Sequence, residues 1–248
     1  MMTIEGDNII QTTNNIKFAT QNNSNNIGVG AASGNLVLDN TVFSTLDIGG
    51  KLIIGDGNQD IYLDSVNLDS ENYSLEVKGR NITLGNFVDV GKSLVMNAVN
   101  LMTLNGRASS NDSGDSLVLV AKRFLNNFGK SALDSGNGRS LIYASSLENV
   151  NAGGIEGDFY FARRYEGYPP STIPGERTAF VFEAPASTYF GGNVDNRLSA
   201  AQSPSQYREN DKDIDRLQNE KSGNNSISMG SSECLVSEES SLYCTISK

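Results

Sequence analysis

Short apolar runs of about four residues recur between residues 26 and 120, and Gly, Asn and Asp separate them. No helical periodicity intervenes, so the pattern favours β-strands. Similar runs return after 16, 23, 19 and 23 residues, measured between Leu36, Leu52, Leu75, Leu94 and Leu117. A drifting period of about twenty residues is typical of a solenoid of short strands joined by variable turns. We therefore predict an all-β fold, a right-handed parallel β-helix with aliphatic side chains stacked inside.

The composition agrees with a β-protein that is rich in turns, because the chain has 25 glycines and no tryptophan. A β-sandwich also uses short strands and glycine-rich turns, and it is the alternative fold at this point. Strand direction separates the two, since solenoid coils pair in parallel with the coils above and below. Mainly antiparallel pairing over residues 26–120 would therefore contradict the β-helix.

The residue pattern of the sequence changes after residue 120. Aromatic residues gather between Phe159 and Phe182, where they can close the open end of a solenoid. From Asn193 onward apolar residues become sparse and charges mix, which predicts a flexible linker with at most a short helix over 209–221. The predicted organisation is a frayed or disordered segment at 1–25, β-helix coils at 26–120, an aromatic-rich capping region at 121–190, a largely disordered polar linker at 191–233 and a terminal cysteine loop at 234–248.

Net charge and hydropathy argue against a nucleic-acid partner, a membrane span and a secretion signal at the start of the chain. The formal net charge is −10, which argues against nucleic acid on electrostatic grounds. No run approaches the roughly eighteen consecutive apolar residues of a membrane span. The start of the chain, Met1 to Asp7, has neither the basic nor the apolar part of a secretion signal. If the protein is exported, we expect this chain to be the C-terminal part of a longer one.

The two cysteines of the chain, Cys234 and Cys244, lie close together in its last fifteen positions. A disulfide between them would close an eleven-residue loop and contribute about 3 kcal/mol, a gain that stays local to that loop. The alternative is a pair of reduced thiols in a flexible tail. A structural zinc site would need four ligands, and the chain has no histidine or further cysteine to supply them. An even cysteine count at short spacing favours the disulfide and an oxidising compartment.

Catalytic and cofactor motifs are weak. The chain has no histidine, and acidic residues such as Asp112 and Asp115 lie in turn-like runs, where an Asx-turn role outweighs catalysis. The run Gly55 to Asp60 resembles a calcium loop but lacks the repetition of one, so we expect a turn there, with no metal and no cofactor. Glycosylation sequons stand at Asn22, Asn72, Asn81, Asn111 and Asn224. A β-helical polysaccharide lyase or hydrolase is the alternative to a non-enzymatic protein.

Residues 124–145 resemble the block that ends the β-helix in filamentous-haemagglutinin-like exoproteins of two-partner secretion. The family form is approximately F-x-N-x-x-G-x-x-A-L followed by G-x-G-R-W-L-x-Y-S, and Ser140 stands here in place of the tryptophan. The resemblance extends over about residues 26–190. It implies a structural cap. Because no helix follows Gly136 to Arg139, this run is not a phosphate loop, and we expect Arg139 to hydrogen-bond to carbonyl groups at the end of the solenoid. The matching positions are Asn127, Gly129, Ala132, Leu133, Gly136, Gly138, Arg139, Leu141 and Tyr143.

The cysteine pair carries a second resemblance, to the cell-retained, high-molecular-weight adhesins of the same family. In that family a terminal disulfide loop lodges the chain in its outer-membrane β-barrel transporter, and Cys234 and Cys244 match the arrangement. An extended chain passes a narrow pore, whereas a closed loop is wider and stops. The resemblance implies a secreted adhesin retained at the outer-membrane surface, without enzymatic activity. Host-cell surface glycans or proteins are the expected outside partners.

Overall fold

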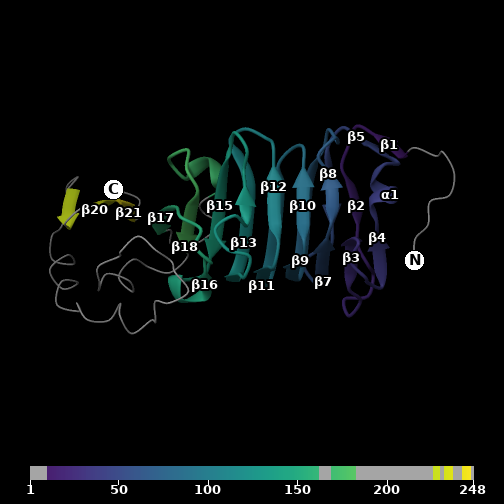
Figure 1. Ribbon diagram of the computed structural model, residues 1–248, viewed down its shortest axis with the longest axis horizontal. Coiled ribbons are helices and arrows are strands. Elements are labelled where there is room, and N and C mark those ends of the chain that lie inside the picture. Colours follow the sequence, from purple (N-terminus) through teal and green to yellow (C-terminus); the bar gives the residue numbers. More distant parts are fainter. Residues whose placement is uncertain (1–9, 162–168, 183–225, 230–231, 237–241, 247–248) are drawn as a thin grey trace.

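The computed structural model describes residues 10–161 and 169–182 and the backbone of three strands at 226–229, 232–236 and 242–246. The chain is mostly β-structure and forms a β-solenoid of about 5 turns (Figure 1). The predicted parallel solenoid is confirmed, and the β-sandwich alternative is wrong for these coils, because their strands pair in parallel. No helix among the described residues is long and apolar enough to cross a membrane.

The described elements follow one another as short strands with one turn of α-helix and two short 3-10 segments. They are β1 (Ile10–Thr12), β2 (Ile16–Phe18), β3 (Ile27–Gly30), β4 (Leu36–Leu38), α1 (Asn40–Phe43), β5 (Leu46–Ile48), β6 (Lys51–Ile54), β7 (Asp60–Asp64), β8 (Val66–Leu68), β9 (Ser74–Leu84), β10 (Phe87–Val90), β11 (Leu94–Leu104), β12 (Arg107–Ser110), β13 (Asp115–Asn126), β14 (Leu133–Asp134), β15 (Arg139–Ala144), η1 (Leu147–Asn149), β16 (Val150–Asn151), β17 (Asp158–Phe161), η3 (Pro170–Thr172), β18 (Ala179–Phe182), β19 (Ser226–Met229), β20 (Ser232–Val236) and β21 (Leu242–Ile246).

Each coil bends around one continuous core. The first face of the solenoid holds β6, the first halves of β9, β11 and β13, and then β15 and β18. The second face holds β3, β7, the second halves of the same three long strands, and β16. The four-stranded sheet β14-β12-β10-β8 and the two-stranded sheet β1–β5 complete the coils. In Figure 1 the coils stack along the long axis, from the N-terminus towards β17 and β18.

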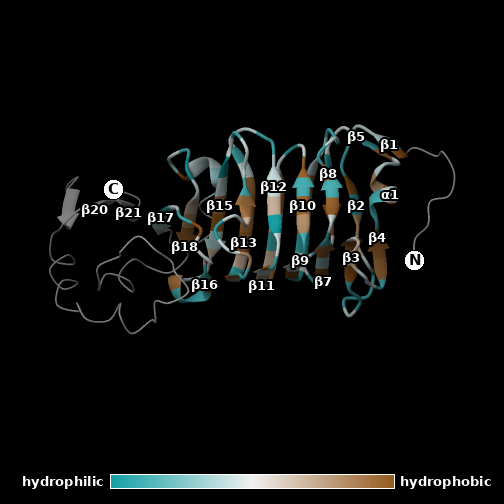
Figure 2. Cartoon of the chain, in the orientation of Figure 1, coloured by the Kyte–Doolittle hydropathy of each residue, from teal (hydrophilic) through white to brown (hydrophobic). Residues whose placement is uncertain are grey.

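The recurring leucines stack in register on the first face. Leu52, Leu75, Leu94 and Leu117 are successive partners on β6, β9, β11 and β13, and all four are fully buried. Burying one leucine side chain contributes about 2 kcal/mol. Figure 2 shows hydrophobic and hydrophilic residues mixed along the strands of the coils, and along β9 buried positions alternate with half-buried or exposed ones, as expected for one face on the core and one in solvent. Leu36 is the exception, because β4 pairs with β3 and lies outside this ladder.

The structure differs from the sequence-based expectation at residues 10–18, which fall in the segment predicted to be frayed. There β1 pairs in parallel with β5, and β2 pairs in parallel with β6. Each strand has only three residues, so neither produces a visible recurrence in the sequence. The next coil supplies their backbone partners, and the half-buried Ile16 and Phe18 pack against the core. Solenoid stacking therefore extends to residues before 26.

Parallel stacking also continues past residue 120, where the sequence predicts that the coils give way to a cap. The strand β13 runs on to Asn126, β15 pairs with β13, and β18 pairs with β15. The described part of the cap, 121–161 and 169–182, thus shares the core of the coils. The predicted linker and its short helix at 209–221 lie mainly outside the described residues. Within the linker, β19 and the start of β20 form an antiparallel pair.

Candidate functional site

A buried asparagine organises the turn where the cap begins. Asn126 ends β13 opposite Leu104, so an amide replaces an aliphatic residue in the inward ladder. Its Nδ2 donates to the carbonyl oxygens of Gly129 (2.8 Å) and Ala152 (2.7 Å). Its Oδ1 accepts from the amides of Phe128 (2.9 Å) and Gly129 (3.1 Å). All four hydrogen-bonding positions of the amide are used, which is why it can be buried.

The cap motif includes the neighbouring Asn127 but not Asn126. Asn127 is exposed, and its Nδ2 donates to Oδ1 of Asn105 on the preceding coil at 2.8 Å. It therefore links two coils at the surface and does not shape the turn from inside. The alternation of a strand could have found Asn126, because it follows the buried Phe124 by two residues and so faces the same side. Gly129 lies in this turn with φ of 103°.

The predicted glycines shape the turn between β14 and β15. Gly136 has φ of 55°, a conformation that favours glycine. At Gly138, a Cβ atom would lie 2.5 Å from Cβ of Ser116, so only glycine lets the turn approach the preceding coil. Leu133 is half-buried on β14 and packs against the core. These residues position the first residue of β15, which is Arg139.

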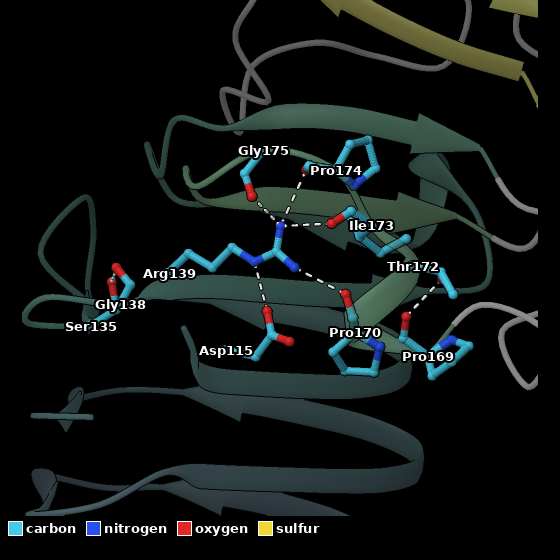
Figure 3. Close-up of polar contacts among 10 residues, drawn as sticks. All are labelled: Asp115, Ser135, Gly138, Arg139, Pro169, Pro170, Thr172, Ile173, Pro174 and Gly175. Carbon is cyan, nitrogen blue, oxygen red and sulfur yellow. Dashed lines mark hydrogen bonds and ion pairs between the residues drawn. The ribbon is translucent and has the colours of Figure 1, made fainter. Parts of the chain in front are cut away.

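Arg139 fastens the end of the solenoid (Figure 3). Its Nε donates to Oδ1 of Asp115 at 2.6 Å, across the register that pairs β13 with β15. Its side chain is only 9% exposed, so the charge needs compensation from neighbouring groups. Carbonyl oxygens of one loop supply this compensation by accepting hydrogen bonds from both terminal nitrogens of Arg139. These oxygens belong to Pro170 (2.9 Å), Ile173 (2.8 Å), Pro174 (3.1 Å) and Gly175.

That loop, residues 169–178, is called the strap below, because it lies over the outer side of the first face. Ile173 of the strap packs into a second hydrophobic cluster, which is separate from the solenoid core. Tyr143, another position of the predicted cap motif, belongs to this cluster and is buried. The outer cluster consists of Val118, Val120, Leu141, Tyr143, Tyr160, Ile173, Ala179 and Val181.

The strand order at this end departs from the order along the chain. β17 precedes β18 in the sequence, but β18 lies between β15 and β17 in the sheet. Phe159 of β17 stacks on Phe180 and Phe182 of β18, with ring centroids 5.6 and 6.2 Å apart. The aromatic-rich stretch thus closes the inner core while the strap covers the outer cluster. The end of the solenoid is buried on both sides of its sheet.

The cysteine hairpin, β20 and β21, continues the sheet beyond β17. The backbones of β20 and β21 pair antiparallel, and Cys234 lies directly opposite Cys244. β21 in turn pairs antiparallel with β17, so that Cys244 lies opposite Phe159. Directly opposite residues of an antiparallel pair have Cα atoms about 4.5–5.5 Å apart. A disulfide needs a distance of about 4.4–6.8 Å between the two Cα atoms, so this backbone register is compatible with one.

The acidic residues that a polysaccharide-cleaving site would use hold turns and ion pairs. Asp39 caps α1, Asp56 accepts the amide of Asn58 at 3.0 Å, and Asp60 accepts two hydrogen bonds from Arg80. The pKa of each carboxyl group is lowered, whereas a general acid requires a raised pKa. The largest cause is a hydrogen bond from the Thr41 hydroxyl to Asp39, from the Asn58 amide to Asp56 and from the Arg80 guanidinium to Asp60.

The remaining candidate acids are also engaged with neighbours. Asp64 accepts from the Ser65 hydroxyl at 2.9 Å, and Asp69 accepts from the Asn111 amide at 2.5 Å. Asp112 accepts the amide of the next residue, and Asp115 pairs with Arg139. The described residues contain no group of three or more His, Cys, Asp or Glu side chains that could hold a metal ion. In the turn from Gly55 to Asp60, Asp56 forms an Asx turn by accepting the backbone amide of Asn58.

Glu71 and Tyr73, which the sequence analysis does not single out, differ from these acids. Burial raises the pKa of the Glu71 carboxyl, and burial together with the Glu71 charge raises the pKa of the Tyr73 hydroxyl. The Tyr73 hydroxyl is buried without a hydrogen-bond partner, and the residue is 2% exposed. The Tyr73 hydroxyl is therefore closed to a polysaccharide chain, whereas Glu71 is half-buried.

Four of the five sequons fall on described residues. Asn22, Asn72 and Asn111 are exposed, and Asn81 is half-buried with its amide donating to Asp60 at 2.8 Å. The fifth, at 224, lies outside the described residues.

No protein-family model matches the sequence, and comparisons with curated proteins and with solved structures return no similar chain.

Proposed function

We propose that this chain is a non-enzymatic, surface-exposed part of an exported adhesin of the two-partner type. In this proposal the solenoid is a stalk, and the cysteine hairpin retains the protein at an outer-membrane β-barrel transporter. The observation that carries the proposal is the backbone register that sets Cys234 opposite Cys244. It supports a short covalent loop, as the resemblance to cell-retained adhesins implies.

The physical basis of retention is a difference in width. An extended chain fits a narrow barrel, whereas two strands joined by a disulfide cannot straighten into a single thread. The segment 193–233 is polar and carries many charges, which suits a water-filled lumen. The solenoid, with a continuous core along its length, is suited to the role of a rigid stalk outside the membrane. Host-surface glycans or proteins are the proposed targets of the whole adhesin.

The test replaces both cysteines by serine in the native host and measures the protein on cells and in the culture medium. We expect the Cys234→Ser/Cys244→Ser variant to move from the cell surface to the medium, and each single variant to behave in the same way. The Ser237→Ala variant, within the loop, is the matched control and should stay on the cells. Undiminished retention of the double variant would contradict the anchor.

The solenoid should be unaffected by the same change. The disulfide closes only eleven residues and its stabilisation of about 3 kcal/mol stays in that loop, so the thermal midpoint of the solenoid should hardly move. An early loss of the coils would instead mean that the bond braces the fold. The enzymatic alternative is tested by screening acidic and neutral polysaccharides. Steady turnover that a single aspartate substitution abolishes would overturn the non-enzymatic proposal.

A further inference from the structure

β17 is the last strand of the parallel stack, and one of its two edges faces away from the solenoid. Its inner edge pairs in parallel with β18. An outer edge without a partner would present unpaired N–H and C=O groups, which is the usual starting point for pairing with another chain. The question is which segment occupies this edge.

The sequence of β17 makes its outer edge prone to pair with another strand. Phe159 and Tyr160 are 6% and 5% exposed, so the strand is buried on its inner and outer sides alike. Aromatic residues favour β-structure. The usual protections of an edge are lysine, proline, a bulge or an inward charge. Here, within β17, the only charged residue is Asp158 at its start, and it pairs with Arg177 of the strap at 3.8 Å.

The structure places β21 on this edge with reversed direction. The register sets Cys244 opposite Phe159 and Tyr243 opposite Tyr160. Solenoid coils add to one another in parallel, so an antiparallel strand ends the series instead of starting a new coil. β20 follows on the far side of β21, and the row that crosses the end runs from Phe180 through Phe159 and Cys244 to Cys234.

We propose that the cysteine hairpin is an edge guard, which occupies β17 and so prevents a second copy of this chain from pairing there. This role goes beyond retention at a transporter, because it operates in the free protein. The cysteine pair fits it, since a bond between directly opposite residues fixes the register of β20 and β21. A strand whose register is fixed offers one defined set of backbone groups to β17.

The experiment compares the full chain with three variants by hydrogen exchange. The first ends at residue 231 and lacks the hairpin. The second is Tyr243→Pro, which removes one N–H from a strand that has partners on both sides. The third, Ser247→Pro, lies one residue beyond β21 and is the matched control. Amides of β9 and β11 report in each sample that the coils remain folded.

We expect the amides of β17 that point towards β21 to exchange roughly 100-fold faster in the first two variants and unchanged in the third. The amides that point towards β18 should stay protected. In sedimentation velocity, the same two variants should form dimers as concentration rises, while the full chain and Ser247→Pro stay monomeric. Equal exchange rates of the β17 amides in all four proteins would contradict the pairing of β21 with the outer edge of β17. Faster exchange without dimers would overturn the guard role.

These measurements use purified protein without a transporter or a membrane. Failure of surface retention in the host would therefore leave their outcome unchanged, and their failure would leave the retention test unchanged. If Tyr243→Pro destabilises the whole hairpin, that variant should expose the same β17 amides as the chain that ends at residue 231. The truncated chain therefore remains a valid reference for the proline variant.

Discussion

The coils from β6 to β11 and those from β13 to β18 share one inner core but differ on the outer side of the first face. One outer row makes the contrast visible: Lys78, Asn97, Val120, Tyr143 and Val181 are successive partners across five strands. The row begins with polar, half-buried residues and ends with apolar, buried ones. The middle of the solenoid thus needs burial on one side only, whereas its end is built by burial on both.

The two regions also use their arginines differently. Arg80, in the coils, forms an exposed ion pair with Asp60. Arg139, in the cap, is buried against Asp115 and carbonyl groups of the strap. An exposed pair is screened by solvent and contributes little, whereas removing one partner of a buried pair strands the other. The comparison indicates that the end is held by a few specific polar contacts, and the middle by repeated packing.

The largest expected effect follows from this difference. Arg139→Gln should lower the free energy of unfolding of the cap by about 3–5 kcal/mol, because Asp115, the buried carbonyl group of Ile173 and the partly buried carbonyl groups of the strap lose their charged donor. The measurement is urea denaturation together with hydrogen exchange in β18. Arg80→Gln is the matched control and should leave both readouts nearly unchanged. Equal effects of the two substitutions would erase the distinction between cap and coils.

The buried asparagine gives the next effect. Asn126→Ala should destabilise the protein by about 2–3 kcal/mol, since it leaves the amides of Phe128 and Gly129 without their acceptor and removes one of the two donors to each of the Gly129 and Ala152 carbonyl groups. Thermal unfolding and urea denaturation would measure it. Asn127→Ala removes only one exposed contact with the preceding coil and should change the stability very little. A larger loss of stability in Asn127→Ala than in Asn126→Ala would mean that the surface contact between Asn127 and Asn105 stabilises the fold more than the buried turn does.

The smallest effect concerns the outer row itself. Val120→Asn should cost about 2 kcal/mol, because a buried valine is replaced by an amide under the strap. The reverse exchange in the coils, Asn97→Val, changes a half-buried position and should stay within about 0.5 kcal/mol of the original. Denaturant midpoints of the two variants test the contrast. If they shift equally, the outer cluster adds nothing beyond the core.

The recurrence of leucines predicted the solenoid well, because the inward ladder is a repeated packing constraint with a period that is visible in the sequence. Leu52, Leu75, Leu94 and Leu117 stack as the spacing implies. Leu36 does not, since β4 belongs to an excursion that pairs with β3. Two three-residue strands before residue 26 have no recurrence at all and depend on partners that lie far along the chain.

The site was less accessible to sequence reasoning. The positions of Gly138 and Arg139 follow from the cap motif, but the carbonyl partners of Arg139 lie more than thirty residues away. The outer cluster could not be predicted, because alternation alone does not say that a loop will cover the outward valines. The inverted order of β17 and β18 has no local signature either. It depends on how the strap crosses the face, which is a property of the folded end.

The inverted order has a kinetic consequence. β17 is complete in the chain before β18, yet its described neighbours in the sheet are β18 and β21. A chain that folds progressively from its N-terminus must therefore leave β17 without its parallel partner until β18 has docked on β15. Bringing the ends of the intervening segment together has an entropic cost before any contact compensates it. We therefore expect β17 and β18 to dock on β15 together, after the preceding coils have formed.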